Sequence, residues 1–164
     1  MASILTAIFP GSFDPPTNGH LDLITRGSRL VHYLIVAVLE NTQKQPLFPV
    51  AERIAMLKEV TAAYSNVEID SFDGLLVDFA AKRGTHAILR GIRAVSDYET
   101  ELQMAALNRR MRPETETIFL MADEAYSFLS SRMIKEIITL GGDVSSFVPP
   151  AVARQLRTKF PAKR

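Results

Sequence analysis

The chain of 164 residues contains no cysteine, so it can form neither disulfides nor thiolate metal sites. This absence also excludes thiol catalysis and redox relays, and it fits a reducing cytosol better than a secreted setting. The three histidines, His20, His32 and His86, are too scattered to suggest a zinc site. A chain of this length buries roughly two-thirds of the surface that its unfolded form exposes, so it needs no covalent or metal staple to hold a core.

Charge imbalance and long apolar runs are missing as well. Nineteen basic against eighteen acidic residues give a net charge of +1, which supplies no general attraction for nucleic acid or an anionic membrane. No segment approaches the ~18 consecutive apolar residues of a membrane span. The uncharged first thirteen residues lack the basic region of a signal peptide, and Pro10-Gly11 interrupts them. We therefore expect a cytoplasmic protein that binds anions through local contacts and binds neither nucleic acid nor membrane.

Short apolar runs alternate with segments of helical periodicity. The runs lack the polar alternation of half-exposed strands and read as strands buried on both faces: 4–9, 33–39, 67–69, 87–89 and 117–121. Apolar residues recur at helical spacing between and after them, over 21–31, 54–64, 75–80, 98–105, 133–138 and 152–160. This order predicts an α/β fold with a single doubly wound, Rossmann-like, five-stranded parallel sheet, helices on both faces and a short C-terminal helix. We expect residues 1–164 to form one domain.

Local signals place several helix ends. Leu21 is expected to open the first helix, Ser96 and Glu99 have capping-box spacing before the fourth, and Gly141-Gly142 follow the fifth. Residues 151–164 hold five basic side chains and no acidic one, which indicates a solvated helix face and a frayed tail rather than a binding patch. Doubly wound sheets bind ligands beyond the carboxyl ends of their strands, so functional residues should follow the strands directly.

The densest chemical signal is the segment 10–20 after the first strand, PGSFDPPTNGH. Its glycines and prolines fix an irregular backbone that leads into a helix N-terminus, and that geometry favours a phosphate. The segment lacks the ending of a P-loop and the GxGxxG spacing of a dinucleotide site. His20 lies in the first helical turn, where it can meet charge on a bound phosphate. A histidine at this place is otherwise a capping or packing residue.

Two further groups of residues suit anionic ligands. Arg90 and Arg93 flank Gly91 just beyond the fourth strand and could hold two separate phosphates, although such arginines are also common in surface ion pairs. Gly91 lets the backbone approach a nucleotide closely. Ser130 and Ser131 precede the fifth helix, where serines cap the helix and can also bind an anion.

The pattern GSFDPPTNGH resembles the G-[ST]-F-D-P-x-T-x-G-H motif of the nucleotidylyltransferase superfamily. Most members carry HxGH, and the TxGH form with Thr17 is similar to that of the phosphopantetheine adenylyltransferase family. The segments LRGIRAVSDYE at 89–99 and YSFLSS at 126–131 resemble the same family in the same order. The resemblance covers nearly the whole chain.

This resemblance implies a reaction in the penultimate step of coenzyme A synthesis. ATP and 4′-phosphopantetheine would give 3′-dephospho-coenzyme A and pyrophosphate by direct in-line attack, without a covalent enzyme intermediate. It further implies Mg²⁺ carried by the ATP phosphates with no protein ligand, coenzyme A-type product ligands and a homohexamer. The implied catalytic residues are His20, Lys44 and Arg90, and the implied substrate-binding residues are Ser12, Lys44, Leu76 and Arg90. The implied nucleotide-binding residues are Ser12, Phe13, His20, Gly91, Ile92, Arg93, Glu101, Tyr126, Ser127, Phe128, Leu129, Ser130, Ser131 and Arg132.

The residues leave alternatives. Lys44 in its polar loop could be solvated, and Leu76 could belong to the core. Relatives often carry a hydroxyl residue at Arg132 and tyrosine at Phe9, so this chain departs from the family pattern at both positions. Thr17 argues against a nicotinate-mononucleotide adenylyltransferase or a cytidylyltransferase, which usually show HxGH. A non-catalytic nucleotide- or RNA-binding module is the other alternative, and the near-neutral charge argues against RNA.

Overall fold

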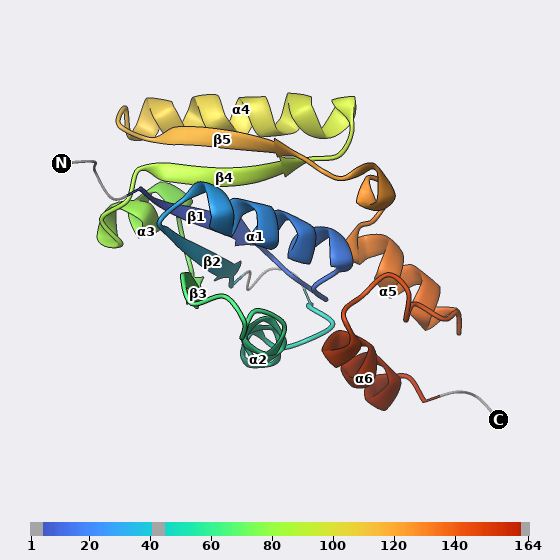
Figure 1. The fold of residues 1–164 in the computed structure, drawn as a ribbon. Coiled ribbons are helices and arrows are strands. Elements are labelled where there is room, and N and C mark those ends of the chain that lie inside the picture. Colours follow the sequence, from blue (N-terminus) through green and yellow to red (C-terminus); the bar gives the residue numbers. More distant parts are fainter. Residues whose placement is uncertain (1–4, 41–44, 162–164) are drawn as a thin grey trace.

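The computed structural model describes residues 5–40 and 45–161, and it forms one five-stranded sheet in the order β3-β2-β1-β4-β5 (Figure 1). Every neighbouring pair of strands is parallel. The strands are β1 (Thr6–Gly11), β2 (Tyr33–Leu39), β3 (Val67–Phe72), β4 (Ala87–Ile92) and β5 (Glu116–Met121). The predicted doubly wound sheet is confirmed, and each predicted strand exists within a few residues of its predicted bounds.

Helices cover both faces of the sheet, as predicted, because each strand carries apolar side chains on both sides. They are α1 (Asn18–Leu30), α2 (Val50–Val60), α3 (Leu76–Lys82), α4 (Val95–Met111), the 3₁₀ helix η1 (Glu124–Tyr126), α5 (Ser131–Thr139) and α6 (Pro150–Lys159). Helices α1 and α2 pack on the face that holds Phe9, Val36 and Leu89. Helices α3 and α4 pack on the opposite face, where Phe79 stacks on Phe72 and Tyr98 meets Phe119 edge-on.

Besides the apolar clusters on the two faces of the sheet, another cluster lies apart from the sheet. It joins α5 and α6 through Ile134, Val152 and Leu156 and reaches the rest of the chain through Phe48 and Met56. Figure 1 shows these two helices beyond the carboxyl ends of the strands. The predicted short C-terminal helix is therefore present as α6, and it supports α5 at the end of the sheet where ligands are expected.

The order of the strands reverses between β1 and β4. Their pairing ends at Ile8 and Ile88, whereas β1 continues to Gly11 beside β2 and β4 continues to Ile92 beside β5. The two strands therefore separate toward their carboxyl ends, and this topological switch point is where doubly wound folds bind ligands.

Two predicted helix starts are wrong. Helix α1 begins at Asn18 instead of Leu21, because Thr17 caps it. Helix α4 has Ala94 as its N-cap with no side-chain cap, so Ser96 lies inside the helix and the predicted capping box is absent. The predicted end of α5 is confirmed, since Gly141 follows it with φ of 88°. Within the described ranges, no helix is long and apolar enough to cross a membrane.

Candidate active site

The loop between β1 and α1 ends in a capping box that fixes His20. The Thr17 hydroxyl oxygen accepts a hydrogen bond from the His20 backbone N–H at 3.3 Å, and the Thr17 backbone N–H donates to His20 Nδ1 at 3.0 Å. Phe13 packs edge-on against the imidazole, with ring centroids 5.0 Å apart. Because Nδ1 accepts a hydrogen bond, the neutral ring carries its proton on Nε2 and can donate only from there.

Burial, together with the smaller effect of the positive charges of Arg93 and Arg90, lowers the pKa of His20 from 6.5 to about 4. The imidazole is therefore neutral at pH 7. It can meet a phosphate as a hydrogen-bond donor rather than as a cation.

We predict that the His20 imidazole of the purified protein stays neutral at pH 6 and titrates near pH 4. Below pH 6.5 the unfolded chain takes up a proton at this histidine, whereas the folded chain does so only near pH 4. The free energy of unfolding that this group contributes is therefore fully present above pH 6.5, and it is lost as the pH falls from 6.5 to about 4. NMR titration, with the His20 signals assigned from a His20→Gln spectrum, measures the pKa. A midpoint near 6.5 would contradict the prediction.

A cavity of about 270 Å³ opens at the switch point between β1 and β4. It is lined by residues from five places that are far apart in the sequence: the β1–α1 loop, the end of β4, helix α4, η1 and the start of α5. Ten predicted site residues line it, namely Ser12, His20, Arg90, Gly91, Arg93, Glu101, Tyr126, Leu129, Ser130 and Ser131. The structure thus brings most of the predicted nucleotide site together.

Both arginines of this cavity are held by carboxylates of α4. The Arg90 guanidinium donates to both oxygens of Glu101, at 2.7 and 2.5 Å, and to the Pro10 carbonyl at 2.8 Å. Arg93 donates to the Asp97 carboxylate at 2.9 Å and to the Leu129 carbonyl at 2.6 Å. The alternative that these arginines form ion pairs with neighbouring carboxylates is therefore correct. It does not replace the predicted role in a ligand site, because both arginines also line the cavity. Such pairing fixes each guanidinium in one orientation.

A second cavity, about 310 Å³, adjoins the first on the other side of Arg90 and Glu101, which line both. Its remaining wall is mainly apolar and includes Leu76, Phe72 and Met104. Leu76 also packs against the core cluster beneath the sheet, so both interpretations of this residue apply.

The other predicted site residues do not line the first cavity. Phe13 and Ile92 are buried beside it, Ser127 donates to the Glu124 carbonyl, and Phe128 and Arg132 are exposed. Lys44 lies outside the described residues. Gly91 lines the cavity, as the predicted close approach of a nucleotide requires, and a Cβ there would also lie 2.3 Å from a terminal methyl of Leu23 in α1. A larger residue at position 91 would therefore displace the Leu23 side chain from its place against β4.

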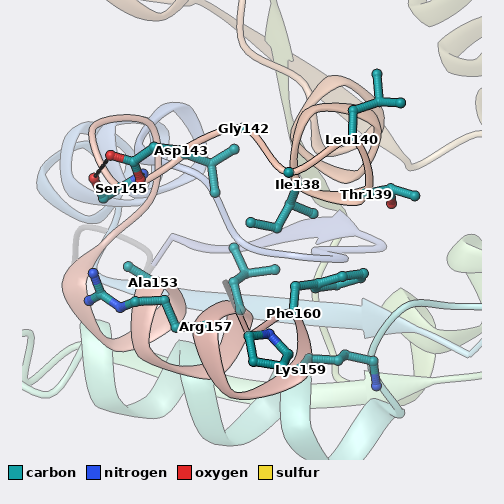
Figure 2. A pocket seen from close by; sticks show the side chains of 14 residues that line it. Ile138, Thr139, Leu140, Gly142, Asp143, Ser145, Ala153, Arg157, Lys159 and Phe160 are labelled. Carbon is teal, nitrogen blue, oxygen red and sulfur yellow. Dashed lines mark hydrogen bonds between the residues drawn. The ribbon is translucent and has the colours of Figure 1, made fainter. Parts of the chain in front are cut away.

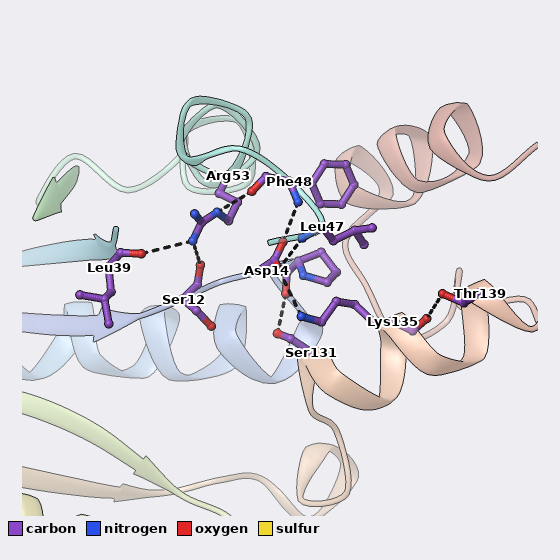
Figure 3. A network of polar contacts seen from close by, with 10 residues as sticks. Ser12, Asp14, Leu39, Leu47, Phe48, Arg53, Ser131, Lys135 and Thr139 are labelled. Atoms are coloured by element: carbon purple, nitrogen blue, oxygen red, sulfur yellow. Dashed lines mark hydrogen bonds and ion pairs between the residues drawn. The ribbon is translucent and has the colours of Figure 1, made fainter. Parts of the chain in front are cut away.

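The β1–α1 loop rests on a buried arginine that the sequence did not single out. The Arg53 side chain, from α2, is 3% exposed and donates to the carbonyls of Ser12 at 2.7 Å and Phe48 at 2.9 Å (Figure 3). Asp97 and Thr17 are also missing from the predicted set. The Thr17-x-x-His20 spacing could have revealed the capping box, whereas the partners of Arg53 are carbonyls that no sequence pattern marks.

A larger cavity of about 770 Å³ lies between the end of α5 and α6 (Figure 2). It shares no lining residue with the cavity at the switch point, and none of the predicted site residues lines it. Size alone therefore does not identify the candidate site. The convergence of phosphate-binding groups at the carboxyl ends of the strands does.

Comparison with known proteins agrees with this assignment. The cytidylyltransferase-like family model matches residues 8–137. A phosphopantetheine adenylyltransferase of Caldanaerobacter subterraneus is 55% identical over 154 residues, which are 94% of this chain and 96% of that protein. The phosphopantetheine adenylyltransferase of Heliobacterium modesticaldum is 50% identical over 154 residues, 94% of this chain and 92% of that protein.

A solved structure with the same fold is that of a proposed nicotinate-nucleotide adenylyltransferase from Vibrio parahaemolyticus. It has a TM-score of 0.62 at 18% identity and covers 94% of this chain and 99% of its own. This likeness concerns the fold alone, whereas the identity and coverage of the curated relatives show the family. The chain belongs to the cytidylyltransferase-like family and, within it, to the phosphopantetheine adenylyltransferases.

Proposed function

We propose that this chain transfers the adenylyl group of ATP to 4′-phosphopantetheine and releases pyrophosphate and 3′-dephospho-coenzyme A. The observation that carries this proposal is the pair of adjoining cavities. The polar one, with His20, Arg93 and the N-terminus of α5, suits a nucleotide triphosphate. The apolar one, with Leu76, suits the pantetheine arm. Arg90 stands between them, where the phosphate of the acceptor and the α-phosphate of ATP would meet.

The reaction needs little from the protein beyond positioning and charge stabilisation. A phosphate oxygen of the acceptor attacks the α-phosphorus in line, a new phosphorus–oxygen bond forms, and the bond to the β-phosphate breaks to release pyrophosphate. A phosphate dianion is already nucleophilic, so no general base is needed. We propose that neutral His20 donates from Nε2 to an α-phosphate oxygen, where charge builds in the transition state.

Arg90 and Lys44 are proposed to align the acceptor phosphate. Arg90 uses three of its five N–H donors on Glu101 and Pro10, which leaves two for a ligand. Arg93 and the N-terminal amides of α5 are proposed to receive the leaving pyrophosphate, because helix N-termini favour anions. These roles follow from the family resemblance, and the placement of the described residues supports them.

Mg²⁺ is proposed to enter with ATP. In the part of the chain that is described, no group of three or more His, Asp or Glu side chains could hold a metal ion. Asp97 and Glu101 are paired with Arg93 and Arg90. This donor set fits an ion held by phosphate oxygens and water, which would neutralise part of the triphosphate charge. We also propose that the protein works in the cytoplasm.

Acceptor choice tests the proposed function. In a pyrophosphate-release assay with ATP and Mg²⁺, we expect rapid release with phosphopantetheine and none with dephosphorylated pantetheine, because that molecule lacks the nucleophile. His20→Ala protein purified in parallel controls for contaminating enzyme. Faster release with nicotinate mononucleotide or a sugar phosphate would overturn the substrate assignment. ATP binding without release for any acceptor would favour a non-catalytic module.

A homohexamer is the assembly that we propose from the family resemblance. Helix α4 supports it, because large apolar side chains stand exposed along its length: Val95, Tyr98, Leu102, Met104, Leu107 and Met111. Apolar surface of this extent is typical of an interface. We expect light scattering after size-exclusion chromatography to give the mass of six chains. Leu107→Glu should lower that mass, whereas Leu140→Glu, at a leucine exposed elsewhere, should not. A monomer in the unmodified protein would refute the proposal.

A further inference from the structure

The carboxylate of Asp14 joins three parts of the chain beside the candidate site. It lies in the β1–α1 loop, is 4% exposed and accepts the backbone N–H groups of Leu47 at 2.8 Å and Phe48 at 2.9 Å. Its third partner is the Lys135 ammonium of α5, with 3.2 Å between Nζ and Oδ2 (Figure 3). Two neutral amides and the Lys135 ammonium thus contact this buried negative charge directly, and the Arg53 guanidinium interacts with it at longer range.

Helix α5 needs such a contact because its apolar side faces away from the sheet. Ile134 packs into the cluster that α5 forms with α6, not into either cluster on the sheet. Two side chains on successive turns of α5 reach the β1–α1 loop instead. The Ser131 hydroxyl donates to the Pro15 carbonyl at 2.7 Å, and Lys135, four residues later, reaches Asp14.

The beginning of α5 forms a wall of the polar cavity. Ser130 and Ser131 line it, and the Ser130 hydroxyl accepts only the Met133 N–H of the first turn. The first backbone N–H groups of a helix have no partners within the helix and are directed toward the anion site. The position of α5 relative to the loop therefore sets the distance between these donors and His20.

We propose that Lys135 is a positioning residue for ATP in the adenylyl-transfer reaction. This inference rests on the proposed function. Lys135 lines neither cavity and acts through Asp14. Its charge seats α5 on the β1–α1 loop, which also lines the polar cavity, and compensates the buried Asp14 carboxylate close to that cavity. A buried carboxylate left without its cation would be costly and would repel the nucleotide phosphates. The acceptor cavity, on the other side of Arg90, depends on neither effect.

Lys135→Met tests this proposal, because it keeps the length of the side chain and removes the charge. We expect the Kd and KM for ATP to rise about tenfold, while KM for phosphopantetheine stays within about twofold. A tenfold change lies between the small effect of losing an exposed ion pair and the large effect of losing a buried one. Lys135→Arg retains the cation and should return the ATP constants to within about threefold of the unmodified protein. Arg112→Met is the matched control. It breaks an ion pair with Asp78 on the protein surface, in which the cation is exposed to a similar degree, 43% against 38% for Lys135, and should change neither constant.

Two results would overturn the positioning role. One is an unchanged ATP affinity in Lys135→Met. The other is a parallel loss for both substrates with a lowered melting temperature, which a merely structural ion pair predicts. Calorimetric titration with ATP alone measures the effect of Lys135 on the ATP Kd without any turnover. Failure of the unmodified protein to form dephospho-coenzyme A would therefore refute the proposed function and still leave the test of Lys135 readable.

Discussion

Replacing His20 by alanine should lower the rate of adenylyl transfer by roughly two to three orders of magnitude and leave ATP affinity nearly unchanged, because the substitution removes a donor that we propose to act in the transition state. The geometry explains why one atom carries this effect. Thr17 occupies Nδ1, and burial keeps the ring neutral, so Nε2–H is the group that can face the α-phosphate. The mutant keeps the Thr17 hydroxyl bond to the backbone N–H of residue 20, so α1 should still begin at the same place.

Single-turnover rates and calorimetric ATP affinity, measured on the same preparation, separate binding from catalysis. His32→Ala is the matched control, since His32 is exposed and its ring accepts the Leu5 backbone N–H far from the cavity. It should leave both quantities unchanged. A fall of less than tenfold in the rate of His20→Ala would rule out the assigned role, and a large loss of ATP affinity would make His20 a ground-state binding residue instead.

The sheet was predictable because both-sided burial leaves a clear pattern. Runs such as 33–39 contain only apolar residues, and β2 is an interior strand whose five middle residues are buried. Helix starts were harder, because they depend on which side chain meets which backbone group. Thr17 caps α1, which begins three residues before the predicted start, whereas Ser96 has the right spacing for a cap and makes none.

In the candidate site too, the residue types could be predicted from the sequence, whereas their contacts could not. Arg90, Arg93 and His20 could be found because charge next to glycine after a buried strand is a strong pattern, and the fold places them at one cavity. Their partners could not be assigned. The resemblance gives Glu101 to ATP, and the described chain places it in a two-oxygen pair with Arg90. The contact of Lys135 with Asp14 spans 121 residues, and no local pattern indicates a pair so distant in sequence.

The two arginines should separate the two substrates. Arg90→Ala is expected to weaken phosphopantetheine about 10- to 150-fold, with a smaller loss for ATP from the unpaired Glu101, and Arg93→Ala to weaken ATP by a similar factor, since each loses charge-assisted hydrogen bonds worth about 1.5 to 3 kcal/mol. Arg132 offers no evident substitute for Arg93, because it is exposed and does not line the cavity. Calorimetric titration of each variant with each substrate measures the four affinities.

A loss of affinity in Arg90→Ala can come from the missing arginine or from the carboxylate that the arginine leaves unpaired. Arg90→Ala leaves Glu101, whose side chain is 15% exposed, as an unpaired charge that lines both cavities and would repel both substrates. The same substitution in a Glu101→Gln background removes that charge. If Arg90 binds the acceptor phosphate, the double variant recovers ATP affinity and still binds phosphopantetheine poorly. If Arg90 serves only to hold Glu101 and the end of β1, the double variant recovers both affinities or loses both together with its melting temperature, and the assignment of Arg90 to the acceptor phosphate fails.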